Sequence, residues 1–253
     1  PHLLEPLTPG VLSLMALLTL ILPFFTPLFR KKGIQPLAAL TALIFLIQLS
    51  FPEIQGTGTW SDRVDGSTLA TITSNLVLTG TYPLFPWILF AALGVTISMH
   101  GSTKGANIPF TRPIKYSVTF GLLFCLSTFY ISQMNGALWA HPTAEATLTF
   151  FPANSAFIIA GFTGVVLIWL FIQSVNTLTL MSAGKMSLTI YVVHFIPLTL
   201  MRGYEVTYQW SLTTSSLAVI AYTLVWIPIS ALWMKRYPKA TLEALLKEIR
   251  KAL

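Results

Sequence analysis

The chain has 253 residues, of which 54% are hydrophobic and only 9% carry charge, and its formal net charge is +7. Soluble domains usually carry about 25% charged residues, so this composition excludes an ordinary soluble domain and predicts a protein embedded in a lipid bilayer. The single cysteine, Cys125, excludes an internal disulfide and a cysteine-based metal cluster.

Uncharged, mostly apolar stretches predict about seven transmembrane helices along the chain. A helix needs about 20 such residues to cross roughly 30 Å of hydrocarbon. The predicted spans are residues 9–29, 34–51, 84–99, 114–133, 153–173, 186–201 and 212–233. The sixth is the shortest, but the flanking Lys185 and Arg202 side chains can extend to the interface. The predicted fold class is therefore all-α, a polytopic transmembrane helix bundle.

The segments outside the spans predict two further helices. A short surface helix is expected at about residues 67–78, within the longest loop. In the tail, apolar residues recur at helical spacing, Pro238 suits the first turn, and Glu243 and Lys247 form an i,i+4 pair. This pattern predicts an amphipathic interfacial helix. The chain is therefore divided into a transmembrane helical domain, residues 1–236, and a cytoplasmic tail, residues 237–253.

Lysines and arginines in the loops predict the orientation. If the first span runs from outside to inside, thirteen of these residues lie inside, and only Arg63 and Arg202 lie outside. Positive charge accumulates on the cytoplasmic side, so the N-terminus is expected outside and the C-terminus in the cytoplasm. An external start without a signal peptide predicts that helices precede residue 1 in a longer protein.

No basic patch with interleaved aromatic residues indicates nucleic-acid binding.

His194 is the clearest candidate for chemistry, because it lies near the middle of the sixth predicted span. Tyr191 and Ser187 precede it by three and seven residues, so one helical face carries all three. Polar groups within a membrane are costly and often functional. His194 is therefore interpreted either as a proton acceptor or substrate ligand, or as a neutral histidine satisfied by a hydrogen bond between helices.

Two groups of charged residues are further candidates for binding. Outside, Asp62 and Arg63, with Asp65, either bind the hydroxyls or amine of a sugar or form a solvated loop. Inside, four cations either bind the phosphates of a nucleotide-like donor such as coenzyme A or only fix the topology. These cations are Lys104, Arg112, Lys115 and Lys185.

Three sequence patterns that mark common classes of enzyme are absent. The chain contains no phosphate-binding glycine-rich loop, no His-Glu-x-x-His and no nucleophile elbow. No metal site is expected. The predicted spans also contain no Asp or Glu, which weighs against an ion-coupled transporter.

Three segments, in matching order, resemble YeiB-like membrane proteins and their relatives of the heparan-alpha-glucosaminide N-acetyltransferase type. The first is residues 76–94, which includes Tyr-Pro-Leu-Phe-Pro-Trp at residues 82–87. The second is residues 184–194, similar to a Gly-x-Met-Ser-Leu-Thr-x-Tyr pattern. The third is residues 241–247, similar to a Gly-Pro-Leu-Glu-Trp-Leu-Leu-Arg tail, although Thr241 replaces its Pro and Ala244 its Trp.

The resemblance implies a membrane acyltransferase that uses acyl-coenzyme A, such as acetyl-coenzyme A, from the inside to acylate a sugar or similar acceptor. Within this chain, the shared helical face favours His194 and Tyr191 for catalysis, and the basic inner loops favour the four inner cations for donor binding. The residues expected to bind the substrate are Ser187, Tyr82, Trp87, Asp62 and Arg63.

The family's early segment, an Arg-Gly pair followed by a catalytic histidine, has no counterpart in this chain. Either the N-terminal helices are missing, or the chain is a non-catalytic relative. The alternative functions are a structural subunit of a membrane complex and a transporter or flippase for a sugar or lipid-linked substrate. The expected partners are the lipid bilayer and either the missing helices or a partner membrane subunit, and a homo-oligomer is a further alternative.

Overall fold

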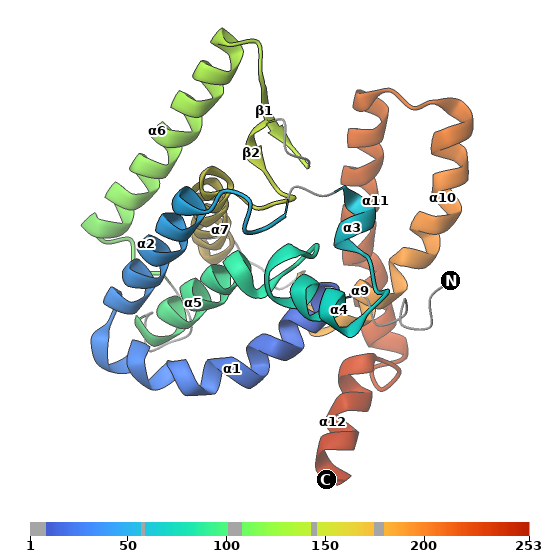
Figure 1. Cartoon of the computed structure of the whole chain (residues 1–253). Coiled ribbons are helices and arrows are strands. Elements are labelled where there is room, and N and C mark those ends of the chain that lie inside the picture. Colours follow the sequence, from blue (N-terminus) through green and yellow to red (C-terminus); the bar gives the residue numbers. More distant parts are fainter. Residues whose placement is uncertain (1–8, 57–58, 101–107, 143–145, 175–179, 253) are drawn as a thin grey trace. The chain divides into compact units, whose positions relative to one another are not determined.

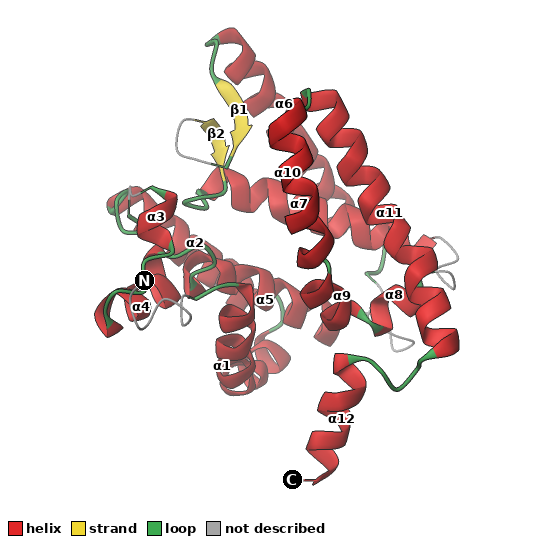
Figure 2. Cartoon of the chain, turned by 90° about the vertical axis from the view of Figure 1, so that its right-hand side faces the viewer, coloured by secondary structure: helices red, strands yellow, loops and turns green. Residues whose placement is uncertain are grey.

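Helices form nearly all of the regular structure of the chain. The computed structural model describes residues 9–56, 59–100, 108–142, 146–174 and 180–252. Within these residues, two short strands are the only departure from helix (Figure 2). The predicted all-α class is confirmed, since long apolar runs satisfy their own backbone hydrogen bonds as helices where water is absent. The chain separates into two units, residues 1–171 and 172–253, which are described separately.

Four helices are long and apolar enough to cross a membrane, and they coincide with the first, fourth, fifth and seventh predicted spans. Their lengths of 20 to 25 residues match the thickness of the hydrocarbon core. They are α1 (Val11–Lys32), α6 (Arg112–Met134), α7 (Ser155–Ser174) and α11 (Leu212–Arg236).

The second and third predicted spans are less regular. Helix α2 (Gln35–Ser50) has only 16 residues. The third span, α5 (Leu84–His100), follows α4 (Leu69–Ser74) and the π-helical turn η2 (Asn75–Thr79), with a bend of 47° between them. The surface helix predicted near residues 67–78 is thus present. By length and apolarity the described residues hold four spans, or five if the bent pair forms one, so the count of seven is not confirmed.

The sixth predicted span is wrong as a single helix. Its residues form two helices that meet at His194, and a third short helix precedes them. These are α8 (Met181–Lys185), α9 (Ser187–Val193) and α10 (Phe195–Tyr208).

The break at His194 has two physical causes. Pro197 has no backbone N–H, so the carbonyl of Val193 loses its helical partner. The carbonyl of His194 accepts a 2.6 Å hydrogen bond from the Tyr222 hydroxyl, while its helical bond from the Leu198 N–H is long, at 3.4 Å. A partner on α11 therefore competes with the helix for this carbonyl.

The first unit is built around α5, which packs against α1 and α2 (Figure 1). Leu89 and Ala92 of α5 are almost completely buried, at 0% and 2% exposed. Helix α7 approaches two other helices through glycines: Gly121 of α6 lies against Thr163, and Gly161 lies against Phe90 of α5. Small residues permit such close contacts between helices within a membrane.

Short elements lie in the two loops that were predicted to be outside. Helix α3 (Trp60–Arg63) lies in the first loop, and strands β1 (Leu138–His141) and β2 (Ala146–Thr149) lie in the second. The two strands pair in parallel, with Leu138 opposite Ala146. No sequence pattern predicted these strands.

In the second unit, α8 packs against α11, and α9 packs against both α10 and α12 (Leu242–Ala252). The predicted tail helix is therefore present. It begins at Leu242, so the prediction that Pro238 lies in its first turn is wrong. Leu245, Leu246 and Ile249 of α12 remain exposed, a pattern that suits an interfacial helix.

Candidate active site

His194 lies at the junction of α9 and α10, where its imidazole is half-buried. Its Nδ1 is 2.6 Å from the carbonyl oxygen of Tyr191 and 3.2 Å from that of Ile190. A carbonyl oxygen only accepts hydrogen bonds, so Nδ1 carries the hydrogen. In the neutral ring the lone pair then lies on Nε2. The helix end therefore fixes the orientation of the imidazole and leaves Nε2 as the nitrogen that can accept a hydrogen bond.

The predicted polar face of α9 is formed only in part. The ring of Tyr191 lies 5.7 Å from the His194 ring, and that of Phe195 lies at 4.1 Å. Ser187 is exposed at the start of α9. In the described residues, no hydrogen bond joins the Ser187 hydroxyl or the Tyr191 hydroxyl to His194.

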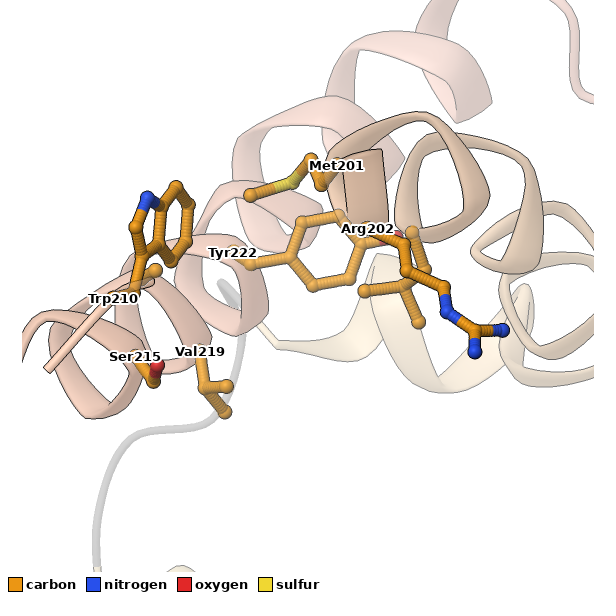
Figure 3. A pocket seen from close by; sticks show the side chains of 8 residues that line it. Met201, Arg202, Trp210, Ser215, Val219 and Tyr222 are labelled. Carbon is orange, nitrogen blue, oxygen red and sulfur yellow. The ribbon is translucent and has the colours of Figure 1, made fainter. Parts of the chain in front are cut away.

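A cavity of about 310 Å³ lies between α10 and α11, beside this junction. Tyr222 connects the cavity to the His194 junction, because its ring lines the cavity and its hydroxyl donates a hydrogen bond to the His194 carbonyl. Figure 3 shows the Tyr222 ring between Trp210 on one side and Arg202 on the other, with the guanidinium pointing away from the ring. Tyr222 was not among the residues predicted from the sequence. The available signal was a tyrosine within an apolar span, whose hydroxyl needs a partner when buried.

Glu243 of the tail helix binds the start of α9. Its carboxylate accepts hydrogen bonds from the backbone N–H groups of Leu188 (2.7 Å) and Thr189 (3.2 Å) and from the Thr189 hydroxyl (2.6 Å). In return, the backbone N–H of Leu242 donates to that hydroxyl at 2.8 Å. The sequence predicted Lys247 as the partner of Glu243, and the structure replaces that partner with α9.

The hydrogen bonds at Glu243 also change its acidity. Burial raises the pKa of the Glu243 carboxyl, but the bonds from the Thr189 side chain and from backbone N–H groups outweigh burial and leave the pKa below its usual value. The carboxylate is thus ionised at neutral pH, where it complements the positive end of α9. This contact brings together the second and third segments on which the family resemblance rests.

The predicted donor-binding cations fall in different units. Arg112 and Lys115 are exposed in the first turn of α6, where the Lys115 ammonium lies 4.8 Å from the centre of the Phe110 ring. Lys185 is exposed at the end of α8, directly before α9. Lys104 lies outside the described residues.

Tyr82 and Trp87, two predicted substrate residues, belong to an aromatic cluster in the first unit. Their ring centres are 5.3 Å apart, and Phe150 lies 5.0 Å from Trp87. The Trp87 Nε1 is buried and has no hydrogen-bond partner among the described residues. Phe150 also lines an open cavity of about 420 Å³ beside His141.

Arg63, the third predicted substrate residue in this unit, stabilises its own loop. Its side chain is only 3% exposed, and its guanidinium donates to the carbonyls of Gly56 (3.0 Å), Thr79 (2.9 Å) and Gly80 (3.4 Å). Burial lowers the pKa of Arg63, and the negative charge of Asp62 opposes that shift. These contacts account for Arg63 without a ligand.

The two acidic residues of this loop also have local partners. The Asp62 carboxylate accepts a 2.7 Å hydrogen bond from the Thr59 N–H. Asp65 accepts bonds from the backbone and hydroxyl of Ser67, at 2.8 and 2.9 Å. Among the described residues, no group of three or more His, Cys, Asp or Glu side chains is placed to hold a metal ion.

Fold and site together define a helical membrane protein with a half-buried histidine at a helix junction. The chain belongs to a family described as an acyltransferase domain, which matches residues 11–234. No curated protein and no solved structure matches the chain. The matched segment includes the four long helices, apart from the last two residues of α11, and the His194 junction, and it ends before α12. The closer resemblance to YeiB-like proteins stays a prediction.

Proposed function

We propose that the protein is an integral membrane acyltransferase, which moves an acyl group from acyl-coenzyme A to the hydroxyl or amine of a sugar or similar acceptor. The orientation of His194 carries this proposal: its Nδ1 is bound to the Tyr191 carbonyl at 2.6 Å, so Nε2 presents a lone pair to an acceptor. Membership of an acyltransferase family supports the same reaction class.

The reaction needs one proton acceptor and one site for a thioester. His194 Nε2 removes the proton of the acceptor hydroxyl or amine as the acceptor attacks the thioester carbonyl. The tetrahedral intermediate then collapses, the carbon–sulfur bond breaks, and the thiolate of coenzyme A takes the proton back from His194. A hydrogen-bond donor that faces the developing oxyanion lowers the barrier, and we assign this role to the Tyr191 hydroxyl.

One further residue of α9 has a binding role in this proposal. Ser187, which precedes His194 by seven residues and is exposed at the start of the helix, binds the acceptor.

The proposed orientation places the donor on the cytoplasmic side. The segments assigned to the inside carry thirteen Lys and Arg residues, against two outside. An acyl-coenzyme A carries several phosphate charges, so a basic inner face attracts it. The acceptor then approaches from within the membrane or from the outside.

The test is acyl transfer by the purified full-length protein in proteoliposomes, with a panel of sugar acceptors. General-base catalysis contributes about 10²- to 10⁴-fold, so His194→Ala lowers kcat by at least about 10²-fold. His141→Ala, which alters an exposed histidine of the other unit, retains activity. Unchanged turnover in a folded His194→Ala variant rules out His194 as the base. No transfer from any acyl-coenzyme A by the wild-type protein rules out the function.

A further inference from the structure

An apolar cavity of about 500 Å³ lies within the first unit, among α2, α5, α6 and α7. Six residues of α6 line it, and four of them, Ile114, Ser117, Val118 and Gly121, recur at helical spacing on one face, while Tyr116 and Phe120 lie to one side of that face. Seven residues of helix extend about 10 Å, so the cavity is long as well as apolar. Its volume lies in the usual range for ligand pockets.

One end of this cavity is strongly basic. Ile34, which lines the cavity, follows Arg30, Lys31 and Lys32 at the end of α1. Ile114, which also lines it, lies between Arg112 and Lys115 at the start of α6. All five cations are exposed. The other end, at Gly121, lies in the uncharged part of α6, residues 116–134.

These positive charges have no acidic counterparts in the neighbouring sequence. Neither residues 6–52 nor residues 66–144 contain a single Asp or Glu. No ion pair in the described part of the chain involves the five cations. A ligand that neutralises them must therefore be an anion. The apolar cavity beside them fits an anion that carries an apolar chain.

We propose that this cavity binds the acyl chain of a long-chain acyl-coenzyme A, whose phosphates lie at the basic end. This inference rests on the proposed function and adds the substrate class: a donor with a chain much longer than acetyl. An acetyl group has a single methyl and fills only a small part of such a cavity. A phospholipid shares the same chemistry, and the test below separates the two.

The experiment compares acetyl-, octanoyl- and palmitoyl-coenzyme A with the full-length protein in proteoliposomes, and measures both binding and kcat/KM. The wild-type protein prefers palmitoyl to acetyl by at least about tenfold. Val118→Trp fills the cavity and reduces palmitoyl transfer while acetyl transfer is kept. Leu123→Trp is the matched control, because Leu123 is 57% exposed on the same helix and does not line the cavity. Ser117→Phe is the second filling variant, in case Val118→Trp does not fold.

Charge is tested separately from chain length. Arg112→Gln with Lys115→Gln weakens the binding of all three donors, whereas Lys235→Gln with Arg236→Gln, at the end of α11, does not. Equal use of acetyl and palmitoyl donors, unaffected by Val118→Trp, overturns the inference and leaves the proposed function standing. Phosphatidylglycerol that stays bound through purification, with no palmitoyl-coenzyme A binding, also overturns it. If no donor is turned over, the proposed function fails, and the binding measurement still decides the inference.

Discussion

The carboxylate of Glu243 holds the tail helix against the start of α9, and Glu243→Gln tests how much this contact stabilises the junction at His194. Glutamine keeps one oxygen acceptor but loses the charge and the second oxygen. Hydrogen bonds to charged groups contribute about 1.5–3 kcal/mol, against about 0.5–1.5 kcal/mol for neutral pairs. Three bonds of 2.6 to 3.2 Å converge on this carboxylate, and α9 has no side-chain cap of its own. We therefore expect Glu243→Gln to reduce the stability of the contact between α12 and the start of α9 by about 2 kcal/mol.

Hydrogen exchange in detergent or nanodiscs measures this loss locally. A change of about 2 kcal/mol corresponds to about 30-fold faster opening, so the amides of Leu188 and Thr189 exchange about 30-fold faster in the variant. Glu248→Gln is the matched control, since it removes only the exposed ion pair to Lys251 on the same helix. Exposed pairs contribute at most about 1 kcal/mol. Unchanged exchange at Leu188 and Thr189 in Glu243→Gln would refute the reasoning.

The pKa of Glu243 makes the same contact depend on pH. Its pKa is lower in the folded state than the usual glutamate value of about 4.3, so the unfolded state binds the proton more tightly. The stabilisation is therefore complete above about pH 5 and is lost as the pH falls through the folded pKa. We expect the exchange protection of α9 to decline in this acid range in the wild-type protein, and Glu243→Gln to abolish the decline.

Three further substitutions test the packing described above. Arg63→Met leaves three backbone carbonyls without their buried donor. Thermal unfolding is therefore expected to show a loss of about 3 kcal/mol in the free energy of unfolding. An unchanged Tm would contradict the dependence of this loop on Arg63. Gly121→Ala places a Cβ 2.9 Å from the Thr163 Cβ, so it is expected to lower the free energy of unfolding by about 1–3 kcal/mol. Gly164→Ala is the neutral control, because the space around Gly164 is open. Tyr222→Phe removes the hydroxyl from the His194 carbonyl, so His194-dependent turnover is expected to fall at least several-fold, and full activity would show that this bond does not position the base.

Hydrophobic patterning predicted the long helices well because it reports directly on burial in lipid. The helices α1, α6, α7 and α11 follow from uncharged runs of sufficient length. The break at His194 was visible in part, since Pro197 signals a lost backbone bond. Its other cause, Tyr222, lies 28 residues away, and no local pattern reveals such a contact.

The candidate site shows the same division between local and distant interactions. Helical spacing placed Tyr191 beside His194, and their rings are in contact range. Glu243 was paired with Lys247 on local spacing, but its partners lie on α9. Likewise, Arg63 belongs to a polar loop in the sequence, and only the fold shows that distant carbonyls bury it.

Transfer of a radiolabelled acyl group from acyl-coenzyme A to an acceptor tests the central claim most directly. The measurement uses the full-length protein in proteoliposomes and follows the labelled product and the free thiol of coenzyme A together. An acyltransferase forms both at a ratio of one to one, and only when an acceptor is present. A folded protein that binds acyl-coenzyme A but yields neither product with any acceptor would contradict the account.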